Sequence, residues 1–83
     1  MTHADVESRV VKIVAQQLGV DKDLVTSDAS FEGDLGAGEF DMAEMISLFE
    51  TEFHISIADY QIDGLKNVAL VVDFVAEHGG DSL

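Results

Sequence analysis

The side chains of this chain that could bind a metal ion are mainly carboxylates. Residues 28 to 39 place several of them at the spacing of a calcium-binding loop. Asp28 and Glu39 fall at the first and twelfth positions of an EF-hand loop, and Gly33 falls at the position of its sharp turn. The candidate oxygen ligands are Asp28, Ser30, Glu32, Asp34 and Glu39. The spacing indicates a calcium-responsive acidic switch through the 28–39 loop as one alternative function.

This stretch also departs from a calcium loop in two respects. The third and fifth positions hold Ser30 and Glu32, which are poorer ligands there than the usual Asp or Asn. Gly19 and Val20 interrupt the helix that should enter the loop. We therefore expect no specific metal site, and only weak divalent binding by the clustered carboxylates.

No pattern typical of catalysis accompanies the acids. The chain has no cysteine, so neither a thiol nucleophile nor a thiolate metal site can form. His3, His54 and His78 are far apart in the sequence and show no ligand spacing. The glycines of segment 33–38 are followed by no Lys-Ser/Thr pair, unlike those of a phosphate loop. Since no nucleophile–base pair is visible, we expect that the chain is not an enzyme.

The charge distribution restricts the partners. The chain holds 17 Asp and Glu against 4 Lys and Arg, a formal net charge of -13, and no Lys or Arg lies between Asp23 and Leu65. Such a surface repels nucleic acid and anionic membranes and attracts a basic protein surface or a cation. The longest apolar run, residues 68–72, is too short to span a membrane. Asp5 and Glu7 precede any apolar run, unlike in a signal peptide, so we expect a cytoplasmic monomer.

Three segments show the apolar period of amphipathic helices, at residues 3–18, 40–53 and 68–78. Residues 59–65 can add a short helical turn, whereas the alternating run 55–57 has no strand to pair with and is expected to be an extended connector. The residues expected to face the core are Val6, Val10, Ile13, Val14, Leu18, Met42, Met45, Ile46, Phe49, Phe53, Val68, Val71, Val72 and Val75.

Local signals define the helix ends and a long first loop. Thr2 and Asp5 have the spacing of a capping box, Gly19 can stop the first helix, and Asn67 can cap the last. The loop over residues 20–37 is expected to pack against the bundle through Val20, Leu24, Val25, Phe31 and Leu35. The sequence thus predicts one all-α domain over residues 1–83, a small antiparallel bundle of three to four helices with a long first loop.

Several segments together match one family. Residues 25–31 (Val-Thr-Ser-Asp-Ala-Ser-Phe) match its first loop, and residues 34–37 (Asp-Leu-Gly-Ala) match the run before its modification site. The acids and Phe53 of the second helix, and Asn67 with the Val-rich segment after it, continue the match. The chain therefore resembles the acyl carrier proteins of fatty acid and polyketide synthesis over nearly its whole length.

The resemblance fails at the residue that carries the family's chemistry. The family attaches 4'-phosphopantetheine as a phosphodiester to the serine of an Asp-Ser-Leu tripeptide at the start of the second helix. Gly38, Glu39 and Phe40 stand at those positions here. A carboxylate cannot form that phosphodiester, so we expect no arm at Glu39. Its charge either mimics the family's phosphate or simply stabilises the helix start.

Two other serines leave open a carrier that uses a non-standard site. Asp81-Ser82-Leu83 spells the family's tripeptide, but Gly79-Gly80 precedes it, and we expect no ordered helix there for a modification site. Ser47 lies inside the second helix, where a surface role is expected.

Together, the charge pattern and the resemblance imply an acidic interaction module of fatty acid or polyketide biosynthesis. It would dock on a basic surface of a biosynthetic enzyme. The expected partner-binding residues are Glu39, Phe40, Asp41, Glu44 and Glu50.

Overall fold

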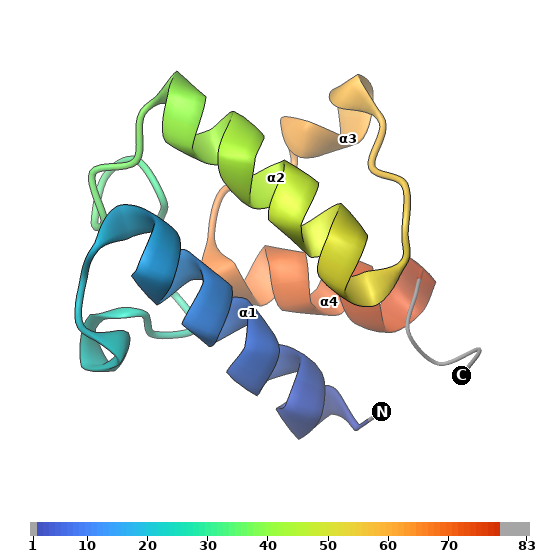
Figure 1. Cartoon of the computed structure of the whole chain (residues 1–83), viewed down its shortest axis with the longest axis horizontal. Coiled ribbons are helices and arrows are strands. Elements are labelled where there is room, and N and C mark those ends of the chain that lie inside the picture. Colours follow the sequence, from blue (N-terminus) through green and yellow to red (C-terminus); the bar gives the residue numbers. More distant parts are fainter. Residues whose placement is uncertain (1, 79–83) are drawn as a thin grey trace.

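The computed structural model describes residues 2–78, which form a small bundle of α-helices (Figure 1). The elements are α1 (His3–Leu18), the 3-10 turn η1 (Lys22–Leu24), α2 (Glu39–Phe53), α3 (Asp59–Ile62) and α4 (Val68–His78). α1 runs in the direction opposite to α2 and α4 (Figure 1). The predicted all-α antiparallel bundle is confirmed, and α2 begins one residue earlier than expected.

Local hydrogen bonds and backbone turns cap the helices at the residues that the sequence predicts. Thr2 Oγ1 accepts from the Asp5 amide at 3.1 Å, and Asp5 Oδ2 accepts from the Thr2 amide at 3.2 Å. These backbone and side-chain hydrogen bonds with Thr2 lower the pKa of Asp5 below its ordinary value. Gly19 closes α1 in the left-handed conformation, with φ 66°, and Asn67 Oδ1 accepts from the Leu70 amide at 2.9 Å.

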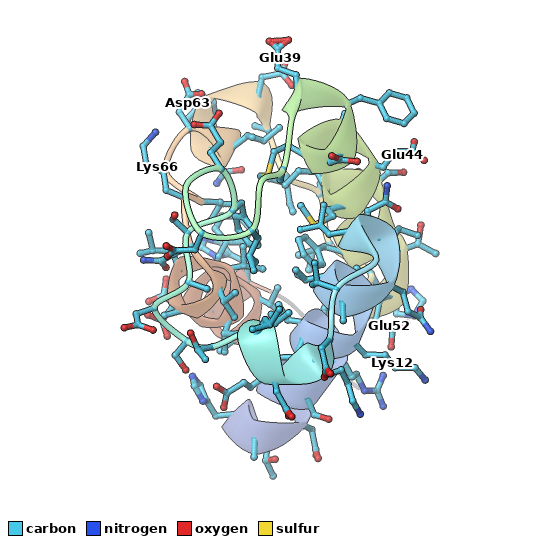
Figure 2. The ribbon with its side chains drawn as sticks, turned by 90° about the vertical axis from the view of Figure 1, so that its left-hand side faces the viewer. Lys12, Glu39, Glu44, Glu52, Asp63 and Lys66 are labelled. Carbon is cyan, nitrogen blue, oxygen red and sulfur yellow. The ribbon has the colours of Figure 1, made fainter. Side chains whose placement is uncertain are left out.

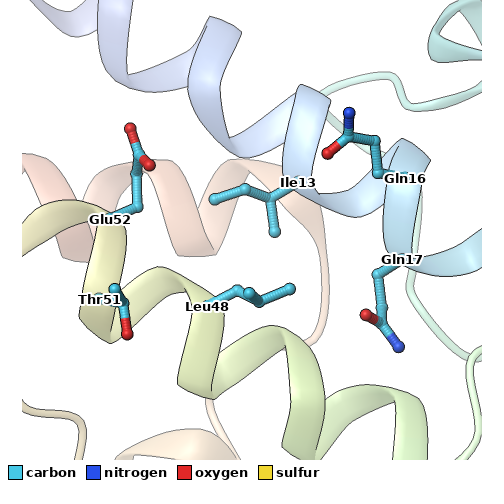
Figure 3. A pocket seen from close by; sticks show the side chains of 6 residues that line it. All are labelled: Ile13, Gln16, Gln17, Leu48, Thr51 and Glu52. Carbon is cyan, nitrogen blue, oxygen red and sulfur yellow. The ribbon is translucent and has the colours of Figure 1, made fainter.

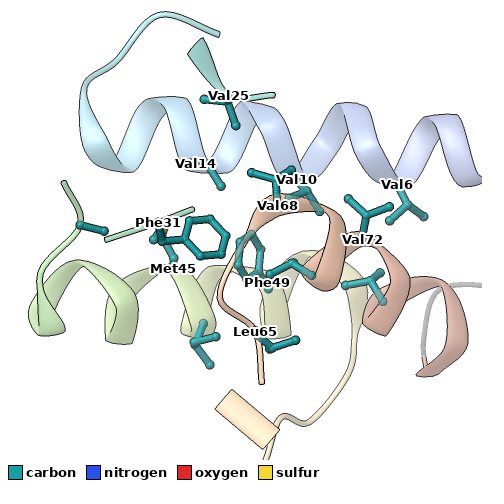
Figure 4. Packing of buried hydrophobic residues seen from close by; sticks show 14 of the residues in the cluster. Val6, Val10, Val14, Val25, Phe31, Met45, Phe49, Leu65, Val68 and Val72 are labelled. Atoms are coloured by element: carbon teal, nitrogen blue, oxygen red, sulfur yellow. The ribbon is translucent and has the colours of Figure 1, made fainter. Parts of the chain in front are cut away.

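The core lies where α1, α2 and α4 meet (Figure 4). The predicted inward faces are largely confirmed, although Ile13, Leu18 and Met42 are only partly buried. The buried apolar residues are Val6, Val10, Val14, Ala15, Val25, Ala29, Phe31, Ala37, Met45, Ile46, Phe49, Phe53, Ile57, Leu65, Val68, Val71, Val72 and Val75. Burial of its valines offsets the low helix propensity of α4, because the apolar face is removed from water.

The first loop packs against the bundle, but not through all the expected residues. Phe31 is 1% exposed and belongs to the core, whereas Leu24 is 60% exposed, so its predicted role as an anchor is wrong. Leu24 ends the η1 turn, which points it outward, and the small residues Ala29 and Ala37 are buried instead. A helical or strand period could not reveal this, because the loop has neither.

Backbone hydrogen bonds fix the same loop to the segment before α4. The Phe31 amide donates to the Lys66 carbonyl at 3.1 Å, and the Val68 amide donates to the Ala29 carbonyl at 3.2 Å. The loop therefore holds a defined position beside the start of α2. Among residues 2–78, no helix combines the length and apolar character needed to cross a bilayer.

Candidate functional site

The start of α2 projects its first two side chains into solvent. Gly36, with φ 70°, turns the chain before the helix, and Gly38 precedes it in an extended conformation. Glu39 is exposed at the first helical position, and Phe40 is 75% exposed. These two neighbouring side chains, exposed where the family resemblance places the modification site, make this end of α2 the candidate site.

The five predicted partner-binding residues divide into two groups. Glu39, Phe40 and Glu44 are exposed. By contrast, Asp41 Oδ2 accepts from the Gly38 amide at 3.2 Å and caps α2, and Glu50 Oε2 accepts from the Ile57 amide at 2.8 Å. Both of these carboxylates are half-buried and already serve the fold. Residue types alone could not distinguish Asp41 and Glu50 from the exposed carboxylates of α2.

The candidate metal ligands of the 28–39 loop are used locally rather than brought together. Asp34 Oδ2 accepts from the Ser30 amide at 2.9 Å, and Ser30 Oγ accepts from the Asp34 amide at 3.0 Å. Asp28 Oδ1 accepts from the Thr26 hydroxyl at 3.0 Å. Within residues 2–78, no three His, Cys, Asp or Glu side chains are grouped to hold a metal ion. The calcium switch therefore gains no support from the geometry.

A groove of about 920 Å³ opens between the first loop, the start of α2 and α3. Its acids are Glu32, Glu39, Asp59 and Asp63, and Lys66 stands beside them. Figure 2 shows Asp63 and Lys66 on the side of α3, Glu39 at the tip of α2, and Glu44 on the other side of α2. The short helical turn predicted within residues 59–65 is present as α3, but the sequence did not indicate the groove beside it, because the packing of separate segments leaves no periodic signal.

A smaller cleft of about 360 Å³ lies between α1 and α2 (Figure 3). Ile13 and Leu48 face each other across it. Amide and hydroxyl side chains line the rest, and its carboxylate, Glu52, accepts from Arg9 Nη1 at 2.9 Å. Among its lining residues, no hydrogen bond pairs the Thr51 hydroxyl with a base, so the cleft shows no nucleophile–base pair.

The residue before α2 and the first two residues of the helix decide what can be attached there. Gly38, Glu39 and Phe40 carry no hydroxyl group, so they do not fit a prosthetic group held through a serine phosphodiester. Ser47 is exposed further along α2. Ser82 lies outside the described residues.

A comparison with known protein families matches most of the bundle. A family model described as "Phosphopantetheine attachment site" matches residues 8–75, which run from α1 into α4 and include all of the loop, α2 and α3. Carrier domains of this family hold 4'-phosphopantetheine and interact with biosynthetic enzymes, and they are not themselves catalytic. The chain belongs to the phosphopantetheine-attachment family of acyl-carrier-type domains.

Proposed function

We propose that this chain is a carrier-type interaction module that docks on a basic surface of a biosynthetic enzyme and bears no 4'-phosphopantetheine at residue 39. The observation that carries the proposal is Glu39 itself. It is exposed at the first position of α2, where the resemblance puts the modified serine, and it holds a carboxylate instead of a hydroxyl.

The fixed charge of Glu39 suits a docking role. A carboxylate at a helix N-terminus is stabilised by the positive end of the helix dipole. Phe40 beside it offers a large apolar surface, and Glu44 adds a second exposed carboxylate five residues further along α2. A basic partner surface would be attracted by the net charge of -13, and the attraction should weaken with salt.

Asp41 and Glu50 take a smaller part in docking than the sequence suggests. Each already accepts a backbone hydrogen bond within the fold. Reversing the charge of Asp41 would remove the cap of α2 as well as a docking charge, so Glu44 is the better residue for a test.

Arm attachment is tested by intact mass. The wild-type protein and Glu39→Ser are each incubated with a phosphopantetheinyl transferase and coenzyme A. We expect no mass change for the wild type and a gain of one arm for Glu39→Ser, while the control Glu39→Gln stays unmodified. A gain of one arm by the wild type would overturn the proposal and would favour a carrier that uses a non-standard serine such as Ser47 or Ser82.

The same reaction reports on docking, with the transferase as a defined partner. In the Glu39→Ser background, Glu44→Lys should lower kcat/KM for arm attachment and reduce its salt dependence. The matched control Glu77→Lys makes the same charge change at an exposed position of α4 and should leave kcat/KM near that of Glu39→Ser. Equal effects of the two reversals would show that only net charge matters, and would contradict a docking face on α2.

A further inference from the structure

Asp63 is the only aspartate of the chain that is followed directly by a glycine. At such a pair the main-chain nitrogen of the glycine can attack the side-chain carboxyl of the aspartate, because glycine has no side chain to hinder the approach. Asp63 and Gly64 are both exposed, and within residues 2–78 the Asp63 side chain makes no hydrogen bond or ion pair. The carboxyl group of Asp63 is therefore accessible to the Gly64 nitrogen and to water.

The reaction at this pair needs only water. The Gly64 nitrogen forms a bond to Asp63 Cγ and gives up its proton, while a Cγ–O bond of the protonated carboxyl breaks and one water molecule leaves. The product is a five-membered succinimide ring. A water molecule then adds to the main-chain carbonyl carbon of Asp63 and breaks the bond from this carbon to the Gly64 nitrogen. The main chain now runs through Cβ and Cγ of Asp63 as an isoaspartate, with mass and charge unchanged.

The folded form of α3 opposes this attack. Asp63 caps the end of α3 with φ -60° and ψ -24°. Ring closure requires the Gly64 nitrogen to eclipse Cβ of Asp63 about the Cα–C bond, and this helical ψ turns the nitrogen away. In addition, the Gly64 amide donates to the Gln61 carbonyl at 3.1 Å, and the Leu65 amide donates to the Ile62 carbonyl at 2.9 Å. The attack therefore occurs only when this turn opens.

Few interactions hold α3 closed. It has four residues, and none of them is buried. The residue at its N-cap is Ala58, whose side chain accepts no hydrogen bond. The Ala58 amide donates instead to Gln61 Oε1 at 2.9 Å. An element with so little buried surface opens locally at a much lower free energy than the whole domain. Opening of α3 is therefore the step that exposes the Gly64 nitrogen.

We propose that Asp63 is a site of spontaneous isoaspartate formation, and that opening of α3 sets its rate. Each event adds one atom to the main chain between α3 and Lys66. The segment after the insertion is fixed, because the Lys66 carbonyl accepts from the Phe31 amide at 3.1 Å and Leu65 is buried. The added length is therefore taken up by α3, which loses its last turn. The modified protein is a substrate for a methyltransferase that recognises isoaspartate.

The test stores the whole protein at neutral pH and follows isoaspartate by two methods. An isoaspartate methyltransferase with labelled S-adenosylmethionine measures the total, and a protease that cuts before aspartate stops cutting at residue 63 once it has isomerised. We expect Asp63 to isomerise faster than Asp28, which is followed by the buried Ala29. The control Gly64→Ala, whose new Cβ would lie 3.5 Å from the Gln61 carbonyl oxygen, keeps the fold and should lose most of the isoaspartate. Isomerisation no faster at Asp63 than at Asp28 would overturn the site.

Two variants change the opening of α3 in opposite directions. Gln61→Ala removes the acceptor of the Ala58 amide and should raise the rate of isoaspartate formation about 2- to 12-fold, the range for one neutral hydrogen bond. Ala58→Ser creates a Ser-x-x-Gln capping box at an exposed N-cap and should lower the rate about 2- to 30-fold. Hydrogen exchange of the Gly64 amide should follow the same order. Equal rates in the wild type and both variants would refute control by α3.

Discussion

The hydrogen bond of Glu50 gives the sharpest test of how the fold uses its acids. Glu50 Oε2 lies 2.8 Å from the Ile57 amide nitrogen, and both groups are at least partly buried. Glu50→Ala removes the charged acceptor and leaves that amide without its partner. A hydrogen bond to a charged group contributes about 1.5–3 kcal/mol. For a domain of this size, the loss corresponds to a decrease in Tm of about 6–24 °C.

Two further variants make this prediction specific, with thermal and urea unfolding followed by circular dichroism. Glu50→Gln keeps an acceptor oxygen, so it should lose about half as much free energy of unfolding as Glu50→Ala. Glu44→Ala removes the same charge from an exposed position of the same helix and should change stability by less than about 0.5 kcal/mol. If Glu50→Ala and Glu44→Ala give equal stabilities, the bond contributes nothing and Glu50 is an ordinary surface acid.

Four other outcomes follow from the structure and can be checked by the same unfolding measurements. Phe31→Ala should cost about 3–5 kcal/mol although it lies in a loop, whereas Leu24→Ala, at a 60% exposed position, should be nearly neutral. Gly36→Ala should cost about 1–2 kcal/mol because φ is 70°, while Gly64→Ala, whose new Cβ would lie 3.5 Å from the Gln61 carbonyl, should be tolerated. Asp5→Asn should be less stable than the wild type at neutral pH. The pKa of Asp5 is lower in the folded state than its ordinary value of 3.8, so the stabilisation is present above that value and is lost as the pH falls through the folded pKa. The difference between the two proteins should therefore vanish in strong acid. Added salt, up to about 1 M NaCl, should raise Tm by screening the net charge of -13, and a lower Tm in salt would contradict self-repulsion.

The sequence by itself determined the helices and their ends. The apolar period of α1, α2 and α4, and the caps at Thr2, Gly19 and Asn67, depend on residues within one or two helical turns of each other. Such short-range interactions can be read along the chain. The family resemblance puts Glu39 at the start of a helix, and its lack of a hydroxyl is a property of the residue alone.

Only the tertiary structure decided which residues of the loop and of α2 are exposed and which are buried or hydrogen-bonded to another segment. Leu24 and Phe31 are both apolar loop residues, yet only Phe31 reaches the core. Glu44 and Glu50 are both acids of α2, yet only Glu50 meets an amide, that of Ile57, seven positions further along the chain. The groove joins the first loop, α2 and α3, so its chemistry depends on how separate segments pack, and packing leaves no local period in the sequence.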